Sequence, residues 1–159
     1  MKIVLYPGTF DPIHRGHVDI CEKASKIFDK VIFSVAENPN KKTFFTTQER
    51  VDMIIDATGH IKNVETMSTS GLIANFAKDM NAVALIRGLR HVSDFEFEFQ
   101  MAMMNNHLNK NVSTLLMVTA EQYIHINSTM IKNVAGLGGD ITDYVTENVM
   151  DQLLLKLNK

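Results

Sequence analysis

Two histidines near the start of the chain, His14 and His17, are three residues apart, with Gly16 between them. They close a loop, residues 6–17, that follows a short apolar run and leads into a helical pattern. The first amides of a helix are unbonded and lie at the positive end of the helix dipole, and both properties suit a phosphate group. A metal site would need a third ligand, and the nearby sequence places none. The spacing therefore favours a phosphate site, and the alternative is a solvated turn that holds two incidental histidines.

Two arginines follow another apolar run, residues 82–86. Arg87 and Arg90 flank Gly88 at the predicted end of a strand. Guanidinium groups stay charged and form paired hydrogen bonds with phosphate oxygens. A solvated basic turn is the commoner setting for two arginines, so the spacing alone leaves both interpretations open.

Capping residues precede a helical pattern in the last third of the chain. Asn127, Ser128 and Thr129 stand just before apolar residues at helical spacing. Such side chains cap helix N-termini, and hydroxyls and free amides at that position can also face phosphate oxygens. The cluster therefore predicts either a plain helix cap or a second anion site. Lys41 and Lys42 follow a strand in a polar loop, where they are either solvated or able to close over a substrate phosphate.

The elements that would position these residues alternate regularly. Apolar, β-branched runs predict strands at residues 3–6, 30–36, 63–68, 82–86 and 113–119. Helical spacing predicts helices at residues 17–28, 72–80, 128–135 and 143–157, and a further helix between a Thr46–Glu49 capping box and Thr58. This order predicts an α/β fold: a Rossmann-like, doubly wound parallel sheet of five strands with helices on both faces, in a single domain over residues 1–159. Such sheets bind ligands at the carboxyl ends of strands, where the motifs above fall.

Residues 95–108 fit two structures. The alternation at their start fits a strand, whereas the whole stretch favours one long helix, which we predict, with Ser93 and Glu96 as its capping box. A helix apolar on two sides needs two covers, and we expect the sheet to be one and a ligand or a second subunit to be the other. The two stripes are Phe95, Phe99 and Ala102, and Phe97, Met101, Met104 and Leu108. Leu72, Ile73 and Cys21 are predicted to pack in the core.

Composition places the chain among ordinary globular domains. It has 159 residues, of which 45% are hydrophobic and 21% charged, and these values exclude disordered and collagen-like classes. The net charge of −2 argues against duplex nucleic acid, whose partners usually carry a basic excess. The single cysteine cannot form an internal disulfide, and no segment has the length and apolarity of a signal peptide or membrane span. We therefore expect a cytoplasmic protein that binds neither nucleic acid nor membrane.

The motifs also resemble those of a known family. Thr9 with the HxGH pattern of residues 14–17 resembles the signature of the nucleotidyltransferase superfamily that includes class I aminoacyl-tRNA synthetases. The run YPGTFDP at residues 6–12, with RGLR at 87–90 and DFE at 94–96, is similar to the bacterial phosphopantetheine adenylyltransferase family, and the likeness spans essentially the whole chain. The chain departs from the family's usual pattern at Asn127, Thr129 and Asn133, and these departures bear on its affinity for nucleotide.

The resemblance implies transfer of an adenylyl group from ATP to 4′-phosphopantetheine, giving dephospho-coenzyme A and pyrophosphate without a covalent enzyme intermediate. It implies catalytic roles for His17, Lys41 and Arg90. It implies acceptor binding by Thr9, Lys41, Ile73 and Arg87. The ATP-binding residues that it implies are Thr9, Phe10, His17, Gly88, Leu89, Arg90, Glu98, Tyr123, Ile124, His125, Ile126, Asn127, Ser128 and Thr129.

The resemblance carries three further expectations. Mg²⁺ would be held mainly by phosphate oxygens and water, with no carboxylate cage. The acceptor's own phosphate would be the nucleophile, so Asp11 and Glu98 are discounted as an acid–base pair. The family forms homohexamers, and a shared pocket makes coenzyme A a candidate feedback inhibitor. The alternatives are another nucleotidyltransferase of the superfamily, which should lack the RGLR and DFE signature, and a nucleotide-binding regulatory module without turnover.

Overall fold

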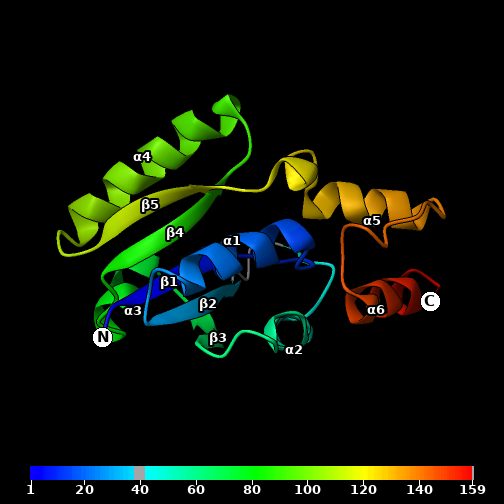
Figure 1. Cartoon of the computed structure of the whole chain (residues 1–159), viewed down its shortest axis with the longest axis horizontal. Coiled ribbons are helices and arrows are strands. Elements are labelled where there is room, and N and C mark those ends of the chain that lie inside the picture. The colour runs from blue at the N-terminus through cyan, green and yellow to red at the C-terminus, as the bar shows by residue number, and fades with distance from the viewer. Residues whose placement is uncertain (38–41, 159) are drawn as a thin grey trace.

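The structure, a computed structural model shown in Figure 1, describes residues 1–37 and 42–158. In this part of the chain, five strands form one parallel sheet in the order β3-β2-β1-β4-β5. This order confirms the predicted five-stranded parallel sheet of a Rossmann-like α/β fold. The strands are β1 (Ile3–Gly8), β2 (Lys30–Glu37), β3 (Val64–Ser70), β4 (Ala84–Leu89) and β5 (Ser113–Val118).

Helices connect the strands and continue the fold after β5. They are α1 (Arg15–Ser25), α2 (Thr47–Thr58), α3 (Ile73–Asp79), α4 (Val92–Leu108), α5 (Ser128–Gly136) and α6 (Glu147–Leu157), with a short 3-10 helix at Glu121–Tyr123. Figure 1 shows α4 lying along β5, and α5 and α6 together at the opposite end of the molecule from the N-terminus.

The alternation of side chains along the strands divides the core into two layers. In β1, Val4 and Tyr6 belong to a large apolar cluster with residues of α1, α2, α5 and α6. Leu5 belongs to a smaller cluster on the other face, which includes Ala77 of α3. Successive side chains of a strand point to opposite faces of the sheet, so both faces of the central strands are covered by helices. Cys21 is fully buried in the large cluster, as predicted.

Several predicted boundaries move by a few residues. The first helix begins at Arg15 instead of His17, and the last begins at Glu147 instead of Asp143. The Thr46–Glu49 capping box is confirmed, since Glu49 N–H donates to Thr46 Oγ1 and Thr46 N–H donates to Glu49 Oε2.

The fourth strand continues to Leu89, so Arg87 and Gly88 are among its last three residues. Of the two arginines, only Arg90 follows the strand. The capping box predicted at Ser93 and Glu96 is wrong. Instead, Asp94 accepts hydrogen bonds from the backbone N–H groups of Arg90 and His91, one turn earlier.

The long helix α4 is confirmed, but its burial differs from the prediction. Its buried residues are Glu98 and Asn105, whereas Phe97 is 59% exposed and Phe99 is 52% exposed. The sheet therefore buries neither apolar stripe, and the expectation that it covers one of them is wrong. Leu72, which is half exposed, is also not a core residue, whereas Ile73 packs against the smaller cluster. None of the helices in the described residues is long and apolar enough to cross a membrane.

Candidate active site

A cavity of about 480 Å³ lies where the β1–α1 loop, the end of β4 and the start of α5 meet. His17 lies in the first turn of α1, Arg90 directly follows β4 and Ser128 begins α5, and all three line this one cavity. The structure therefore brings together the three motifs that the sequence places far apart. The predicted site residues in its lining are Thr9, Phe10, His17, Arg87, Gly88, Arg90, Glu98, Tyr123, Asn127, Ser128 and Thr129.

The remaining predicted site residues lie elsewhere. Among those that the structure describes, Leu89, Ile124, His125 and Ile126 are outside the lining of this cavity. Ile126 is fully buried, and its carbonyl accepts a hydrogen bond from Arg90 Nη1 at 3.1 Å. Lys41 lies outside the described residues, so its predicted role stays a prediction. Its neighbour Lys42 lines the cavity.

The two histidines stack at the start of α1. Their ring centroids are 3.6 Å apart, and the backbone N–H of His14 donates a hydrogen bond to Nδ1 of His17 at 3.2 Å. Burial, followed by the charge of Arg90, lowers the pKa of His14 to about 3. Burial, followed by His14, Arg90 and Arg87, holds the pKa of His17 well below its ordinary value. Both rings are therefore neutral at pH 7.

The hydrogen bond from His14 also sets the tautomer of His17. A neutral imidazole carries one proton, and Nδ1 of His17 acts as an acceptor, so the proton is on Nε2. His17 therefore offers the cavity that it lines a neutral N–H donor and no positive charge.

The loop before α1 folds tightly over β1. Phe10 has a left-handed backbone with φ of 51°, and its ring lies so close to Gly8 that a Cβ there would come within 2.8 Å of it. At Gly16, a Cβ would come within 3.1 Å of the His14 ring. A side chain at position 8 would therefore displace the Phe10 ring, and one at position 16 would press on the His14 ring.

Arg87 and Glu98 form a two-pronged ion pair at the edge of the cavity. Nε and Nη2 of Arg87 donate to Oε2 and Oε1 of Glu98 at 2.7 and 2.8 Å, and Nη1 donates to the carbonyl of Pro7 at 2.8 Å. The family resemblance assigns these residues to different ligands, Arg87 to the acceptor and Glu98 to the nucleotide. The ion pair fixes the guanidinium beside β1 and buries the Glu98 carboxylate on α4.

Two side-chain hydrogen bonds hold the start of α5. Oδ1 of Asn127 accepts from the N–H of Met130 at 2.8 Å, so Asn127 is a working N-cap. Oγ of Ser128 donates to the carbonyl of Pro12 at 2.8 Å and joins α5 to the β1–α1 loop. The helix cap and the anion site, which the sequence left as alternatives, are compatible because the capped end lines the cavity.

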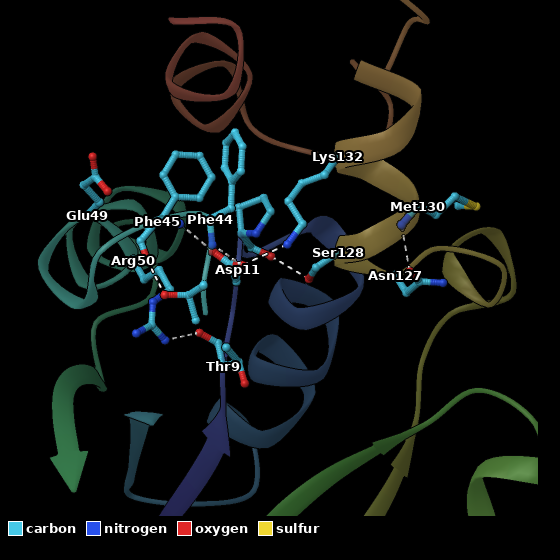
Figure 2. A network of polar contacts seen from close by, with 12 residues as sticks. Thr9, Asp11, Phe44, Phe45, Glu49, Arg50, Asn127, Ser128, Met130 and Lys132 are labelled. Carbon is cyan, nitrogen blue, oxygen red and sulfur yellow. Dashed lines mark hydrogen bonds and ion pairs between the residues drawn. The ribbon is translucent and has the colours of Figure 1, made fainter. Parts of the chain in front are cut away.

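Asp11 and Lys132 are part of the site and were not predicted to be. Figure 2 shows the carboxylate of Asp11 between the loop at Phe44 and Phe45 and the side chain of Lys132 on α5. Lys132 Nζ donates to Oδ2 of Asp11 at 2.8 Å, and both residues line the cavity. One signal could have indicated Lys132, because it lies four residues after Ser128 and hence on the same face of the helix.

Arg50 of α2 is a further residue that the sequence did not mark. It is 2% exposed, and its Nη1 donates to the carbonyl oxygens of Thr9 at 2.7 Å and Ala36 at 3.1 Å. It therefore anchors the backbone of the β1–α1 loop to the end of β2. Figure 2 shows this contact with Thr9.

A second cavity of about 340 Å³ adjoins the first, since Pro7 lines both. Its other walls come from β2, β3 and the start of α3: Ser34, Ala36, Glu37, Thr69, Gly71 and Ile73. Ile73, which the resemblance assigns to the acceptor, therefore lies in this second cavity and not in the first.

Comparisons with known proteins agree with this geometry. The family model described as cytidylyltransferase-like matches residues 5–134, and the chain belongs to this class of nucleotidyltransferases. A solved structure described as a putative nicotinate-nucleotide adenylyltransferase from Vibrio parahaemolyticus shares the fold. Its TM-score is 0.68, its identity is 22%, and the alignment covers 97% of this chain and 99% of that one.

Closer relatives define the family within this class. A phosphopantetheine adenylyltransferase of Heliobacterium modesticaldum is 49% identical over 98% of this chain and 93% of its own length. Those of Bordetella pertussis and Clostridium botulinum are 49% and 47% identical, over 94% and 97% of this chain and 88% and 97% of their own lengths. The chain belongs to the phosphopantetheine adenylyltransferase family.

Proposed function

We propose that this protein transfers the adenylyl group of ATP to 4′-phosphopantetheine and releases dephospho-coenzyme A and pyrophosphate. The relatives' names support this reaction, because they match over nearly the whole chain at 47–49% identity. The observation that carries the proposal is the meeting of His17, Arg90 and Ser128 around one cavity. A triphosphate seated there would touch all three motifs at once.

The nucleophile in this proposal is the acceptor's own phosphate. A phosphate monoester has a second pKa near ~6, so it is largely a dianion at pH 7 and needs no protein base. Two polyanions repel each other, and the protein must supply position and favourable donors. A neutral His17 fits this task, since its Nε2–H can donate to an oxygen of the α-phosphate without giving up a proton.

The other groups divide between the two ends of the reaction. Arg90 and the start of α5, with Ser128 and Thr129, would hold the outgoing pyrophosphate. Thr9 would orient the attacking phosphate, and Lys41 and Arg87 would hold it, although Arg87 is already paired with Glu98. The second cavity, with Ile73, would take the rest of the acceptor.

Magnesium enters the proposal through the substrate. In the described part of the chain, no group of three or more His, Cys, Asp or Glu side chains is placed to hold a metal ion. A Mg²⁺ ion that keeps most of its waters and binds phosphate oxygens suits such a site, because it needs few protein ligands. When bound, it would neutralise charge on the triphosphate.

Assembly, location and regulation are also parts of the proposal. The exposed apolar stripes of α4 support a homo-oligomer, for which the resemblance implies six copies. A cytoplasmic location accords with the single, buried and unpaired Cys21. Coenzyme A shares the acceptor's arm and would compete for the same two cavities.

The test is a pyrophosphate-release assay with ATP and Mg²⁺. Release that depends on 4′-phosphopantetheine, with dephospho-coenzyme A identified by mass, is expected. Faster release with another acceptor, such as nicotinate mononucleotide, than with 4′-phosphopantetheine would assign the chain to another nucleotidyltransferase of the same fold. Nucleotide binding without any release would indicate the regulatory alternative.

A further inference from the structure

The carboxylate of Asp11 connects three segments that border the cavity. Its Oδ1 accepts from the backbone N–H of Phe45 at 2.8 Å, and its Oδ2 accepts from the N–H of Phe44 at 2.9 Å. The same Oδ2 accepts from Lys132 Nζ at 2.8 Å. Asp11 thus joins its own β1–α1 loop to the segment before α2 and to α5, as Figure 2 shows.

The two segments that Asp11 holds each carry a lysine into the cavity. Lys132 lies one turn after Ser128 on α5, at the side proposed for the triphosphate. Lys42 lies two residues before Phe44 and lines the same cavity, and it follows Lys41, to which the proposed function gives the acceptor phosphate. A carboxylate that binds both segments fixes the positions of both cations relative to each other.

The surroundings of Asp11 are consistent with a permanently charged group. Asp11 is 7% exposed. Burial opposes its ionisation, but the hydrogen bonds from Lys132, Phe44 and Phe45 outweigh burial and lower the pKa of Asp11 below its ordinary value. Asp11 is the acceptor in all three hydrogen bonds, and an ionised carboxylate, which has no proton to donate, can accept every one of them.

Lys132 of α5 also contacts this segment directly, since its Nζ lies 6.0 Å from the centroid of the Phe44 ring, a longer contact than its 2.8 Å hydrogen bond with Asp11. Lys156 of α6 lies over the ring of Phe45 at 5.0 Å and pairs with Glu49 of α2, so it steadies the outer side of this segment. Its side chain is absent from the described lining of the cavity, whereas Lys132 is in it. Only the Asp11 carboxylate, among the contacts described for the chain, joins the Phe44 and Phe45 amides to a cation inside the cavity.

We propose that Asp11 is a positioning residue for both substrates: it holds Lys132 against the triphosphate and holds the Phe44–Phe45 backbone so that Lys42 faces the acceptor phosphate. This role rests on the proposed function and deepens it. Asp11 exchanges no proton in the reaction. It acts through the two lysines, so its loss should weaken the binding of both substrates, whereas the loss of Lys132 should weaken only the nucleotide.

The experiment compares Asp11→Asn with Lys132→Met by two readouts. Calorimetry measures the affinity for a non-hydrolysable ATP analogue, and steady-state kinetics measures KM for 4′-phosphopantetheine. Each variant should bind the analogue on the order of tenfold more weakly, because a charge-assisted contact is lost or misplaced. Only Asp11→Asn should also raise KM for the acceptor, by several-fold. The double variant should bind the analogue no more weakly than either single variant.

Glu65→Gln is the control. Glu65 of β3 forms an ion pair with Lys30 of β2, and neither residue lines either cavity. This variant should keep both affinities within about twofold, because independent sites contribute separately.

Three results would overturn the proposal. They are unchanged affinities in Asp11→Asn, a change confined to the nucleotide in that variant, and additive effects in the double variant. If Asp11→Asn does not fold, Lys132→Met alone tests the proposal. The proposal is contradicted if Lys132→Met weakens the binding of both substrates or of neither, because Lys132 is expected to act on the nucleotide only. If wild-type protein releases no pyrophosphate, the proposed function fails, and the analogue measurements still test the coupling of Asp11 to Lys132.

Discussion

Replacing His17 with alanine removes one neutral donor from the cavity. Nδ1 of His17 is occupied by the N–H of His14, so the ring has a single free N–H, at Nε2. Loss of one preorganised donor to the transition state typically lowers kcat by about 10²–10³, or about 2.7–4 kcal/mol. Because the ring is neutral, its loss removes no positive charge from the resting site, and ATP binding should weaken by less than about tenfold, the value of an ordinary hydrogen bond.

The assay separates these two quantities. Single-turnover release of pyrophosphate at saturating ATP gives the chemical step, and calorimetry gives the affinity for an ATP analogue. His17→Gln is the control, since its amide N–H reaches about as far as Nε2 and should restore part of kcat. A kcat of His17→Ala within about tenfold of wild type would refute the role of the donor. A loss of ATP affinity as large as the loss of kcat would show that His17 binds the ground state equally well.

Three further predictions concern the fold around the site. Because burial lowers the pKa of His14 to about 3, the unfolded chain binds more protons than the folded chain below about pH 6.5, so the melting temperature should fall between about pH 7 and 5. His14→Gln should flatten this dependence, and an equally steep curve would count against it. Asn127→Ala should lower the free energy of unfolding by about 1 kcal/mol in denaturant titrations, with Asn127→Ser near wild type, since both residues cap helices; equal losses in the two variants would exclude the cap. Cys21, whose pKa burial raises to about 12, should resist iodoacetamide at pH 8 until the protein unfolds, and a native adduct seen by mass would contradict its burial.

The order and type of the elements could be read from the sequence because the driving pattern is local. Apolar runs such as residues 30–36 belong to strands covered on both faces, and a fully apolar strand followed by a periodic helix leaves few arrangements other than a parallel sheet. The carboxyl ends of parallel strands then fall at one edge, which is why His17, Arg90 and Ser128 could be expected to meet.

The burial of α4 and the polar anchors could not be read in the same way. The sequence shows that α4 is apolar on two sides, but whether its own sheet or another surface covers them depends on where the helix lies over β4 and β5. Arg50 and Asp11 are charged residues whose partners include backbone groups far away in the sequence. Backbone N–H and C=O groups exist at every residue, so no pattern of side chains reveals such partners.

The interpretation of Arg87 and Glu98 has a similar limit. Each residue was assigned a ligand of its own by resemblance, and neither spacing nor composition indicated that they pair with each other across the cavity edge. The pair joins the end of β4 to the second turn of α4, and its geometry depends on the crossing of those two elements. Phosphate binding by Arg87 therefore stays a prediction, to be tested with the acceptor present.

The central claim is that fixed donors around one cavity bring two substrates together for direct transfer, with no nucleophile from the protein. The stereochemical course at the α-phosphorus tests it most directly. With a single diastereomer of ATP carrying sulfur at the α-phosphate, one direct displacement by 4′-phosphopantetheine predicts dephospho-coenzyme A of inverted configuration. A product of retained configuration would reveal two successive displacements through an adenylylated side chain, and would contradict the account.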